Sequence, residues 1–135
     1  MYLRRADDLG TGGSVSSFVF VGEQRSELAK TLGYTWSDGR LAGRQLFDAL
    51  LACEIDPDCQ HYTNYFENGG PYIVDYWRAR GVIVVAMGQK VHAALEERGI
   101  KHLTIVHPAA RGSIRLKKNY AAHVEDVLLG RSNDE

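Results

Sequence analysis

Residues 82–87 read VIVVAM, an unbroken apolar run in which β-branched side chains dominate. A second run, SFVFVG at residues 17–22, has the same character. Short runs that are apolar on both faces are typical of central strands in a parallel sheet, which helices cover on both sides. These two stretches therefore predict the middle of a parallel sheet.

Two further β-rich runs, HYTNYF at residues 61–66 and HLTIV at residues 102–106, predict two more strands. Between and after the strands, apolar residues recur at three- and four-residue spacing, which predicts helices with one buried stripe each. These residues are Leu46, Phe47, Leu50 and Leu51; Ile73, Tyr76 and Trp77; Val91, Ala94 and Leu95; and Tyr120, Val124, Val127 and Leu128. Because strands alternate with helices, we expect an α/β fold, a three-layer α/β/α sandwich with a mainly parallel four-stranded sheet.

The chain has 135 residues, of which 44% are hydrophobic, and this suits a single domain. Residues 1–16 combine charge with Gly and Ser and predict a flexible arm, residues 17–130 form the domain, and residues 131–135 are an acidic tail. The sequence shows no signal-peptide pattern and no apolar stretch near the ~20 residues that span a bilayer. We therefore expect a soluble cytoplasmic monomer.

Its two cysteines, Cys53 and Cys59, are too few for a four-thiolate zinc site or an iron–sulfur cluster. A buried, reduced pair of thiols is favoured over a disulfide, and we expect no metal and no other cofactor. The formal net charge of −1 argues against binding of nucleic acid through the overall field. Basic residues do gather between Arg111 and Lys118, but such a cluster is more often a solvated face than a phosphate site.

Ligands of such folds bind beyond the carboxyl ends of the strands, where loops and helix N-termini meet. The predicted strands end in polar or glycine-containing segments that could form one site together. These segments are GEQRS (residues 22–26), TNYF (63–66), MGQK (87–90) and HPAARG (107–112).

Three residues at these strand ends suit chemistry on a nucleobase, and each has a plainer alternative. Glu23 could orient or deprotonate a water, or it could cap a helix or pair with an arginine. The amide of Asn64 donates and accepts, which suits a pyrimidine edge, although a lone asparagine at a strand end more often forms a local turn. His107 follows an apolar strand and is fixed by Pro108, so its imidazole could stabilise an oxyanion, unless its role is structural.

Neighbouring side chains could add binding surfaces. Tyr65 and Phe66 offer ring faces on which a base could stack, or they pack in the core. Arg111 could meet a phosphate or fill the gap that an extruded nucleotide leaves in a duplex.

Five segments resemble, in order and approximate spacing, the uracil-DNA glycosylase superfamily over roughly residues 17–130. They are FVFVGEQRS (18–26), RLAGRQLFDALL (40–51), HYTNYF (61–66), VVAMGQKVHAAL (84–95) and HPAARG (107–112). The chain is similar to a minimal, iron–sulfur-free member. The resemblance implies a monofunctional DNA glycosylase that flips out a pyrimidine nucleotide and hydrolyses its N-glycosidic bond.

The resemblance also implies a role for each strand end. It implies catalysis by Glu23, His107 and Gln24; base binding by Asn64, Phe66, Tyr65 and Ser26; and DNA binding by Gly88, Gln89, Lys90, Arg111, Ser113 and Arg115. Asn64 would hold the base edge, and His107 would donate to the carbonyl oxygen of the leaving base. Glu23 is preferred over Gln24 for positioning the water, because an amide is a poor base.

Several positions depart from the family pattern. Arg25 stands where the first motif usually has Pro, and Ala109 stands where the second motif commonly has a phosphate-binding Ser. Ser26 occupies the place where the uracil-specific branch has a Tyr that blocks C5 of the pyrimidine. We therefore hypothesise a pocket that accepts pyrimidines modified at C5, which suits base excision or defence against phages with modified genomes.

Two other functions stay open on the sequence alone. One is a catalytically inactive DNA-binding protein with the same fold. The other is a hydrolase that acts on free nucleotides or nucleosides, which needs no basic surface. The near-neutral charge permits both.

Overall fold

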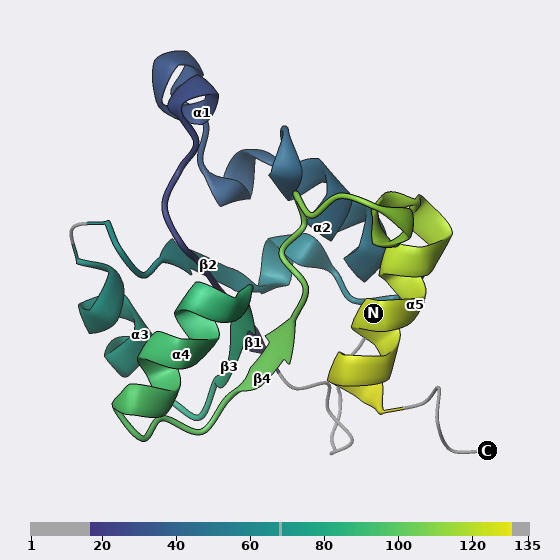
Figure 1. Ribbon diagram of the computed structural model, residues 1–135. Coiled ribbons are helices and arrows are strands. Elements are labelled where there is room, and N and C mark those ends of the chain that lie inside the picture. Colours follow the sequence, from purple (N-terminus) through teal and green to yellow (C-terminus); the bar gives the residue numbers. More distant parts are fainter. Residues whose placement is uncertain (1–16, 68, 131–135) are drawn as a thin grey trace.

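The computed structural model of the protein describes residues 17–67 and 69–130, so the predicted arm (1–16) and acidic tail (131–135) lie outside the described residues. Four strands form one parallel sheet in the order β2-β1-β3-β4 (Figure 1). They are β1 (Phe18–Gly22), β2 (His61–Asn64), β3 (Ile83–Met87) and β4 (Leu103–Ile105). The predicted parallel four-stranded sheet is thus confirmed.

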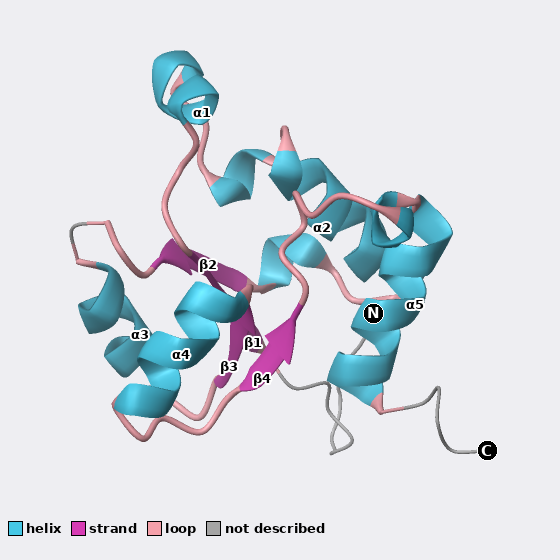
Figure 2. Cartoon of the chain, in the orientation of Figure 1, coloured by secondary structure: helices cyan, strands magenta, loops and turns pink. Residues whose placement is uncertain are grey.

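Helices cover both faces of this sheet, which confirms the three-layer architecture (Figure 2). The covering helices are α2 (Ala42–Ala52), α3 (Gly70–Arg78), α4 (Gln89–Glu97) and α5 (Lys117–Leu129). A further short helix is α1 (Glu27–Leu32). Helices α2 and α5 pack on one face, and α3 and α4 pack on the other (Figure 1).

The core follows from the two-residue period of a strand, which turns successive side chains to opposite faces. In β1, Phe18 and Phe20 pack towards α2 and α5, whereas Val19 and Val21 pack towards α3 and α4. Strand β3 divides in the same way, and all five residues of β1 are buried. The two apolar runs that predicted the centre of the sheet do form it.

Some helical patterns differ from the prediction in detail. In α2, Leu46 and Leu50 are buried, but Leu51 is 59% exposed. In α3 the buried side chain is Val74, while Tyr76 is 39% exposed. The amphipathic spacing therefore located both helices but misplaced the edge of each buried stripe, because a shift of one residue rotates the stripe by about 100°.

Helix α1 was not among the helices predicted from apolar spacing, and it buries none of its residues. It projects away from the sheet (Figure 1) and begins at Ser26, whose side chain accepts a hydrogen bond from the Ala29 amide at 3.1 Å. Cys53 is buried but Cys59 is exposed, so the expectation of a buried pair of thiols was wrong for Cys59. Within the described ranges, no helix has the length and apolar character needed to cross a bilayer.

Candidate functional site

The register of the sheet aligns the carboxyl ends of neighbouring strands. Gly22 pairs with Asn64, and Met87 pairs with Ile105, so the following loops all leave from one edge. A cavity of about 350 Å³ lies at this edge. Its walls come from the loop after β1, α1, the segment between α1 and α2, the start of α2 and the loop after β4. They are formed by Glu23, Gln24, Arg25, Ser26, Leu28, Ala29, Tyr34, Thr35, Trp36, Arg40, Leu41, Ala42, Gly43, His107 and Ala109.

Glu23 follows β1 and His107 follows β4, and both lie beside Gly88. A Cβ built on Gly88 would lie 3.5 Å from the Glu23 Oε2 atom and 3.5 Å from the His107 Cβ atom. Gly88 itself has a φ of +101°, which side-chain-bearing residues rarely adopt. The glycine after β3 therefore leaves room beside the ends of β1 and β4 for both a carboxylate and an imidazole.

The hydrogen bonding of His107 determines which of its ring nitrogens carries the proton in the neutral form. The backbone N–H of Ala109 donates to His107 Nδ1 at 3.0 Å, so the neutral ring carries its proton on Nε2. Burial lowers the pKa of His107 below its ordinary 6.5, and the nearby Glu23 carboxylate opposes this shift without reversing it. His107 is therefore a neutral hydrogen-bond donor at pH 7.

We expect the depressed pKa of His107 to make the protein less stable in acid. Below pH 6.5 the unfolded chain binds a proton at this histidine that the native state resists, so the free energy of unfolding falls as pH drops towards the folded pKa. Burial lowers the pKa of His61 and His123 in the same direction. Thermal unfolding between about pH 7.5 and pH 5 should show a falling Tm.

The His107→Gln variant should show a smaller fall in Tm over this range, because it removes one of the three histidines whose pKa is lowered in the folded protein. Gln24→Ala, at an exposed position in the same cavity, is the control and should retain the pH dependence of the parent chain. A Tm that rises on acidification, or an unchanged slope in His107→Gln, would contradict the assignment.

The side-chain amide of Asn64 is hydrogen-bonded to Trp36. The indole Nε1–H donates to Asn64 Oδ1 at 2.7 Å, and Asn64 Nδ2 donates to Glu67 Oε2 at 3.3 Å. Asn64 is only 8% exposed, and its two polar atoms are thereby satisfied within the protein. The residue predicted to read a base instead holds an aromatic wall of the cavity in this conformation.

Gly22 makes this arrangement possible. A Cβ at this position would lie 2.7 Å from Asn64 Oδ1 and 2.9 Å from the Trp36 ring. The Trp36 ring also packs towards His107, with 5.9 Å between their centroids. Glycine at the end of β1 therefore lets the indole lie against the strand, next to the imidazole.

The aromatic walls of the cavity are Trp36 and Tyr34 rather than Tyr65 and Phe66. Tyr65 is buried in the cluster beneath α3 and α4, and Phe66 is 50% exposed and contacts Tyr65 edge to face. Arg40 lies over the Tyr34 ring, with 5.1 Å from its Cζ to the centroid. The usable signal in the sequence was TWSDG at residues 35–39, a tryptophan in an otherwise polar segment.

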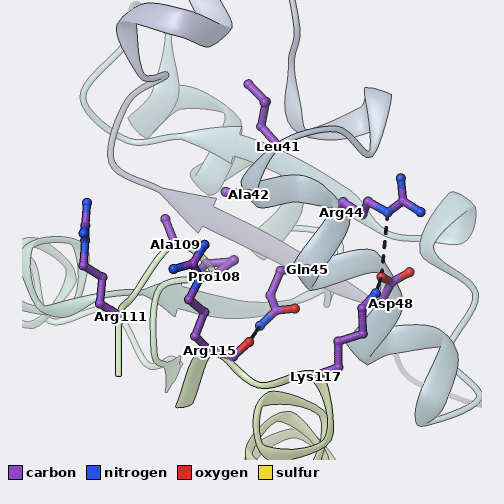
Figure 3. Close-up of a pocket in the computed structure, with 10 residues that line it drawn as sticks. All are labelled: Leu41, Ala42, Arg44, Gln45, Asp48, Pro108, Ala109, Arg111, Arg115 and Lys117. Atoms are coloured by element: carbon purple, nitrogen blue, oxygen red, sulfur yellow. Dashed lines mark hydrogen bonds and ion pairs between the residues drawn. The ribbon is translucent and has the colours of Figure 1, made fainter. Parts of the chain in front are cut away.

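A second cavity, of about 650 Å³, borders the first and shares Leu41, Ala42 and Ala109 with it. We call it the basic groove. Its other lining residues are Arg44, Gln45, Asp48, Pro108, Arg111, Arg115 and Lys117 (Figure 3). The groove lies between α2 and the loop that connects β4 to α5, so residues about 70 apart in sequence form its two sides, as in the 2.9 Å hydrogen bond from Gln45 to the Arg115 carbonyl.

The charges in the basic groove are unequal. Asp48 forms ion pairs with Lys117 and Arg44 (Figure 3). Within the described part of the chain, Arg111 and Arg115 form no ion pair and both are exposed. Arg111 and Arg115 are therefore available to bind an anion. Arg44 and Lys117, which also line the groove, were not among the predicted DNA-binding residues.

The remaining predicted residues lie near these cavities without lining them. Gln89 and Lys90 are exposed on the first turn of α4, next to Gly88. Ser113 is exposed in the short 3₁₀ helix that precedes α5, and its carbonyl accepts a hydrogen bond from Asn119 at 2.7 Å. The structure thus brings together Glu23, Gln24, Ser26 and His107 in one cavity, and Arg111 and Arg115 in the adjoining groove.

No protein-family model matches this sequence. The search of curated proteins gives no match either.

Proposed function

We propose that this protein is a DNA base glycosylase, in which the 350 Å³ cavity receives an extruded pyrimidine and the basic groove binds the flanking phosphates. The observation that carries the proposal is the presence of Glu23 and His107 in one cavity with aromatic walls. This cavity adjoins a groove in which Arg111 and Arg115 form no ion pair with any other described residue. A cavity of this size is typical of sites that bind small molecules. The proposed hydrolysis needs no cofactor.

His107 stabilises the leaving base in this mechanism. As the N-glycosidic bond breaks, negative charge develops on a carbonyl oxygen of the pyrimidine. A neutral imidazole whose Nε2–H faces that oxygen can donate a hydrogen bond, and the Ala109 amide keeps the proton on this nitrogen. Because the donor is oriented before the reaction, little reorganisation accompanies the charge.

Glu23 positions the water that captures the sugar cation. Its carboxylate lines the cavity beside Gly88, and an ionised carboxylate both accepts a hydrogen bond from water and stabilises a developing cation. Gln24, its exposed neighbour, can orient a water but is a poor base. We therefore assign the water-positioning role to Glu23.

Trp36 and Tyr34 supply the stacking surface for the base. Stacking on an aromatic side chain contributes roughly 1–3 kcal/mol per base and tolerates different bases. Asn64 then acts as a positioning residue, since its oxygen accepts from Trp36. It contacts the base directly only if Trp36 swings away and releases the amide.

Arg111 and Arg115 bind the DNA backbone next to the extruded nucleotide, together with the rest of the basic groove. The net charge of −1 argues against DNA binding through the overall electric field of the protein. A local groove avoids this objection, because the contact with DNA depends on a few arginines. Affinity for DNA should accordingly fall as salt rises.

Ser26 supports a substrate with a group on C5 of the pyrimidine. It lines the cavity with a small side chain whose hydroxyl is engaged in capping α1, so it leaves room where a tyrosine ring would block the pocket. An enzyme of this kind would act as a monomer in the cytoplasm, in base excision or in defence against phages with modified pyrimidines.

The test is a panel of oligonucleotides, single-stranded and duplex, that carry uracil, thymine or a C5-substituted cytosine. We expect abasic sites, revealed by alkaline strand cleavage, with at least one C5-substituted base. The matched variant Ser26→Tyr should lose activity on C5-substituted bases and keep any activity on uracil. Excision of uracil alone by the parent chain would refute the open pocket, and the absence of abasic product from every oligonucleotide would refute the glycosylase.

A hydrolase acting on free nucleotides is the second candidate, favoured by the near-neutral net charge. It predicts turnover of mononucleotides at a rate that changes little with salt, since no long phosphate backbone is bound. An inactive DNA-binding protein predicts salt-sensitive binding of duplex without abasic product. The same protein preparation can be assayed for all three outcomes.

A further inference from the structure

Three potential metal ligands meet on the α4 side of the sheet, outside the cavity and groove described above. His92 and Glu96 lie one turn apart on α4, and His102 lies in the loop between α4 and β4. One ligand atom from each residue lies within 4.8 Å of the other two. Spacing of four residues puts His92 and Glu96 on the same face of the helix, which is the usual way for a helix to contribute two metal ligands.

The two histidines are oriented by hydrogen bonds of the kind that support metal ligands. His102 Nδ1 lies 2.7 Å from the Ile100 carbonyl oxygen, so this nitrogen carries the ring proton and His102 Nε2 has a free lone pair. That lone pair faces His92 Nδ1 at 2.9 Å. A backbone carbonyl that orients the ring from its other nitrogen is typical of histidines that bind a metal.

A hydrogen bond between the two rings accounts for only part of this arrangement. It explains the contact of His92 with His102, and the Thr104 hydroxyl lies 3.0 Å from the same His92 nitrogen. It gives no reason for the Glu96 carboxylate to approach the same point. A cation held to one side of the two nitrogens, towards the Glu96 carboxylate, would use all three side chains, with His92 shifting its proton to Nε2.

The distances suit a small tetrahedral cation after a modest movement. With Zn–N bonds of about 2.0–2.1 Å, two nitrogen ligands of a tetrahedral zinc lie about 3.3 Å apart. The observed 2.9 Å therefore has to open by about 0.4 Å, which rotation of half-buried imidazoles allows. Two imidazoles and one carboxylate favour zinc over magnesium or calcium, which prefer oxygen ligands.

We infer that His92, Glu96 and His102 bind one Zn²⁺ ion, with water completing its coordination, and that the ion ties α4 to the start of β4. The site does not depend on the glycosylase proposal, because none of its ligands lines the catalytic cavity or the basic groove. Its chemistry differs from the thiolate sites that the cysteine count excluded.

Zinc binding can be measured by calorimetry and by thermal unfolding in a Cys59→Ser background, which removes an exposed thiol that could also bind metal. We expect one Zn²⁺ per chain and a rise in Tm of roughly 5 °C at saturation, as follows from binding to the native state alone. Mg²⁺ should cause no such rise. Co²⁺ should give the visible absorption of a tetrahedral site.

Variants at the ligands test the site directly. His92→Ala and His102→Ala should abolish the zinc-dependent rise in Tm, and Glu96→Gln should weaken zinc binding about tenfold or more. Glu97→Gln, at the exposed neighbouring position of α4, is the matched control and should bind zinc like the parent. Absence of binding by the folded parent, or equal binding by His102→Ala that retains its circular dichroism, would overturn the inference.

Discussion

His107→Ala is expected to lower the rate of single-turnover base excision by about 10²–10³-fold, which corresponds to roughly 2.7–4 kcal/mol of transition-state stabilisation. The expected loss is large because, in the proposed mechanism, the donor acts on the atom where charge develops. The rate is measured with enzyme in excess over an oligonucleotide that carries the preferred base. Excess enzyme separates the chemical step from product release.

His107→Gln is the informative companion, because its amide N–H can reach the position of the imidazole Nε2–H. Its loss of rate should be smaller than that of His107→Ala. Both variants must retain the circular dichroism of the parent and its affinity for DNA, since the basic groove does not include His107. A His107→Ala rate within twofold of the parent would remove this residue from the mechanism.

Gly70→Ala is expected to destabilise the protein by about 3 kcal/mol or more, a large part of the total stability of a domain of this size. A Cβ at Gly70 would lie 2.2 Å from the Asn64 carbonyl oxygen and 2.6 Å from the Tyr65 carbonyl oxygen. Both atoms belong to backbone at the end of β2, so relief requires α3 to move from the sheet. Urea unfolding measures the loss.

Gly81→Ala is the matched control for this substitution. Gly81 has a φ of +83° but no heavy atom within 4 Å of its missing Cβ, so alanine there costs only the backbone strain of about 1–2 kcal/mol. At Gly70, by contrast, the destabilisation comes from the steric clash of the new Cβ with neighbouring backbone atoms. Equal destabilisation by the two substitutions would show that α3 is not packed against β2 as closely as described.

The central strands and the placing of Glu23 and His107 in one cavity were predictable because their causes are local. Two apolar runs specify strands covered on both faces, and parallel strands place the residues after their carboxyl ends at one edge. Glu23 and His107 follow β1 and β4 closely, so the rule brought them together without knowledge of any side-chain contact. Burial of β1 and β3 needed no further information.

The aromatic walls were not predictable in this way. Trp36 meets Asn64, its partner 28 residues away, only because Gly22 leaves space between them. No local pattern distinguishes the buried Tyr65 from the exposed Phe66, which are adjacent in sequence. The basic groove likewise needs Arg44 from α2 beside Arg115 from the loop before α5.

By itself, the sequence determined the four parallel strands, their flanking helices and the edge at which a site would form, since strand and helix periodicity depends on neighbouring residues. Only the tertiary structure decided that Asn64 holds Trp36, that Trp36 and Tyr34 line the cavity, and that two histidines and a glutamate converge beside β4. These contacts join side chains from separate elements, and their distances depend on how the helices pack on the sheet.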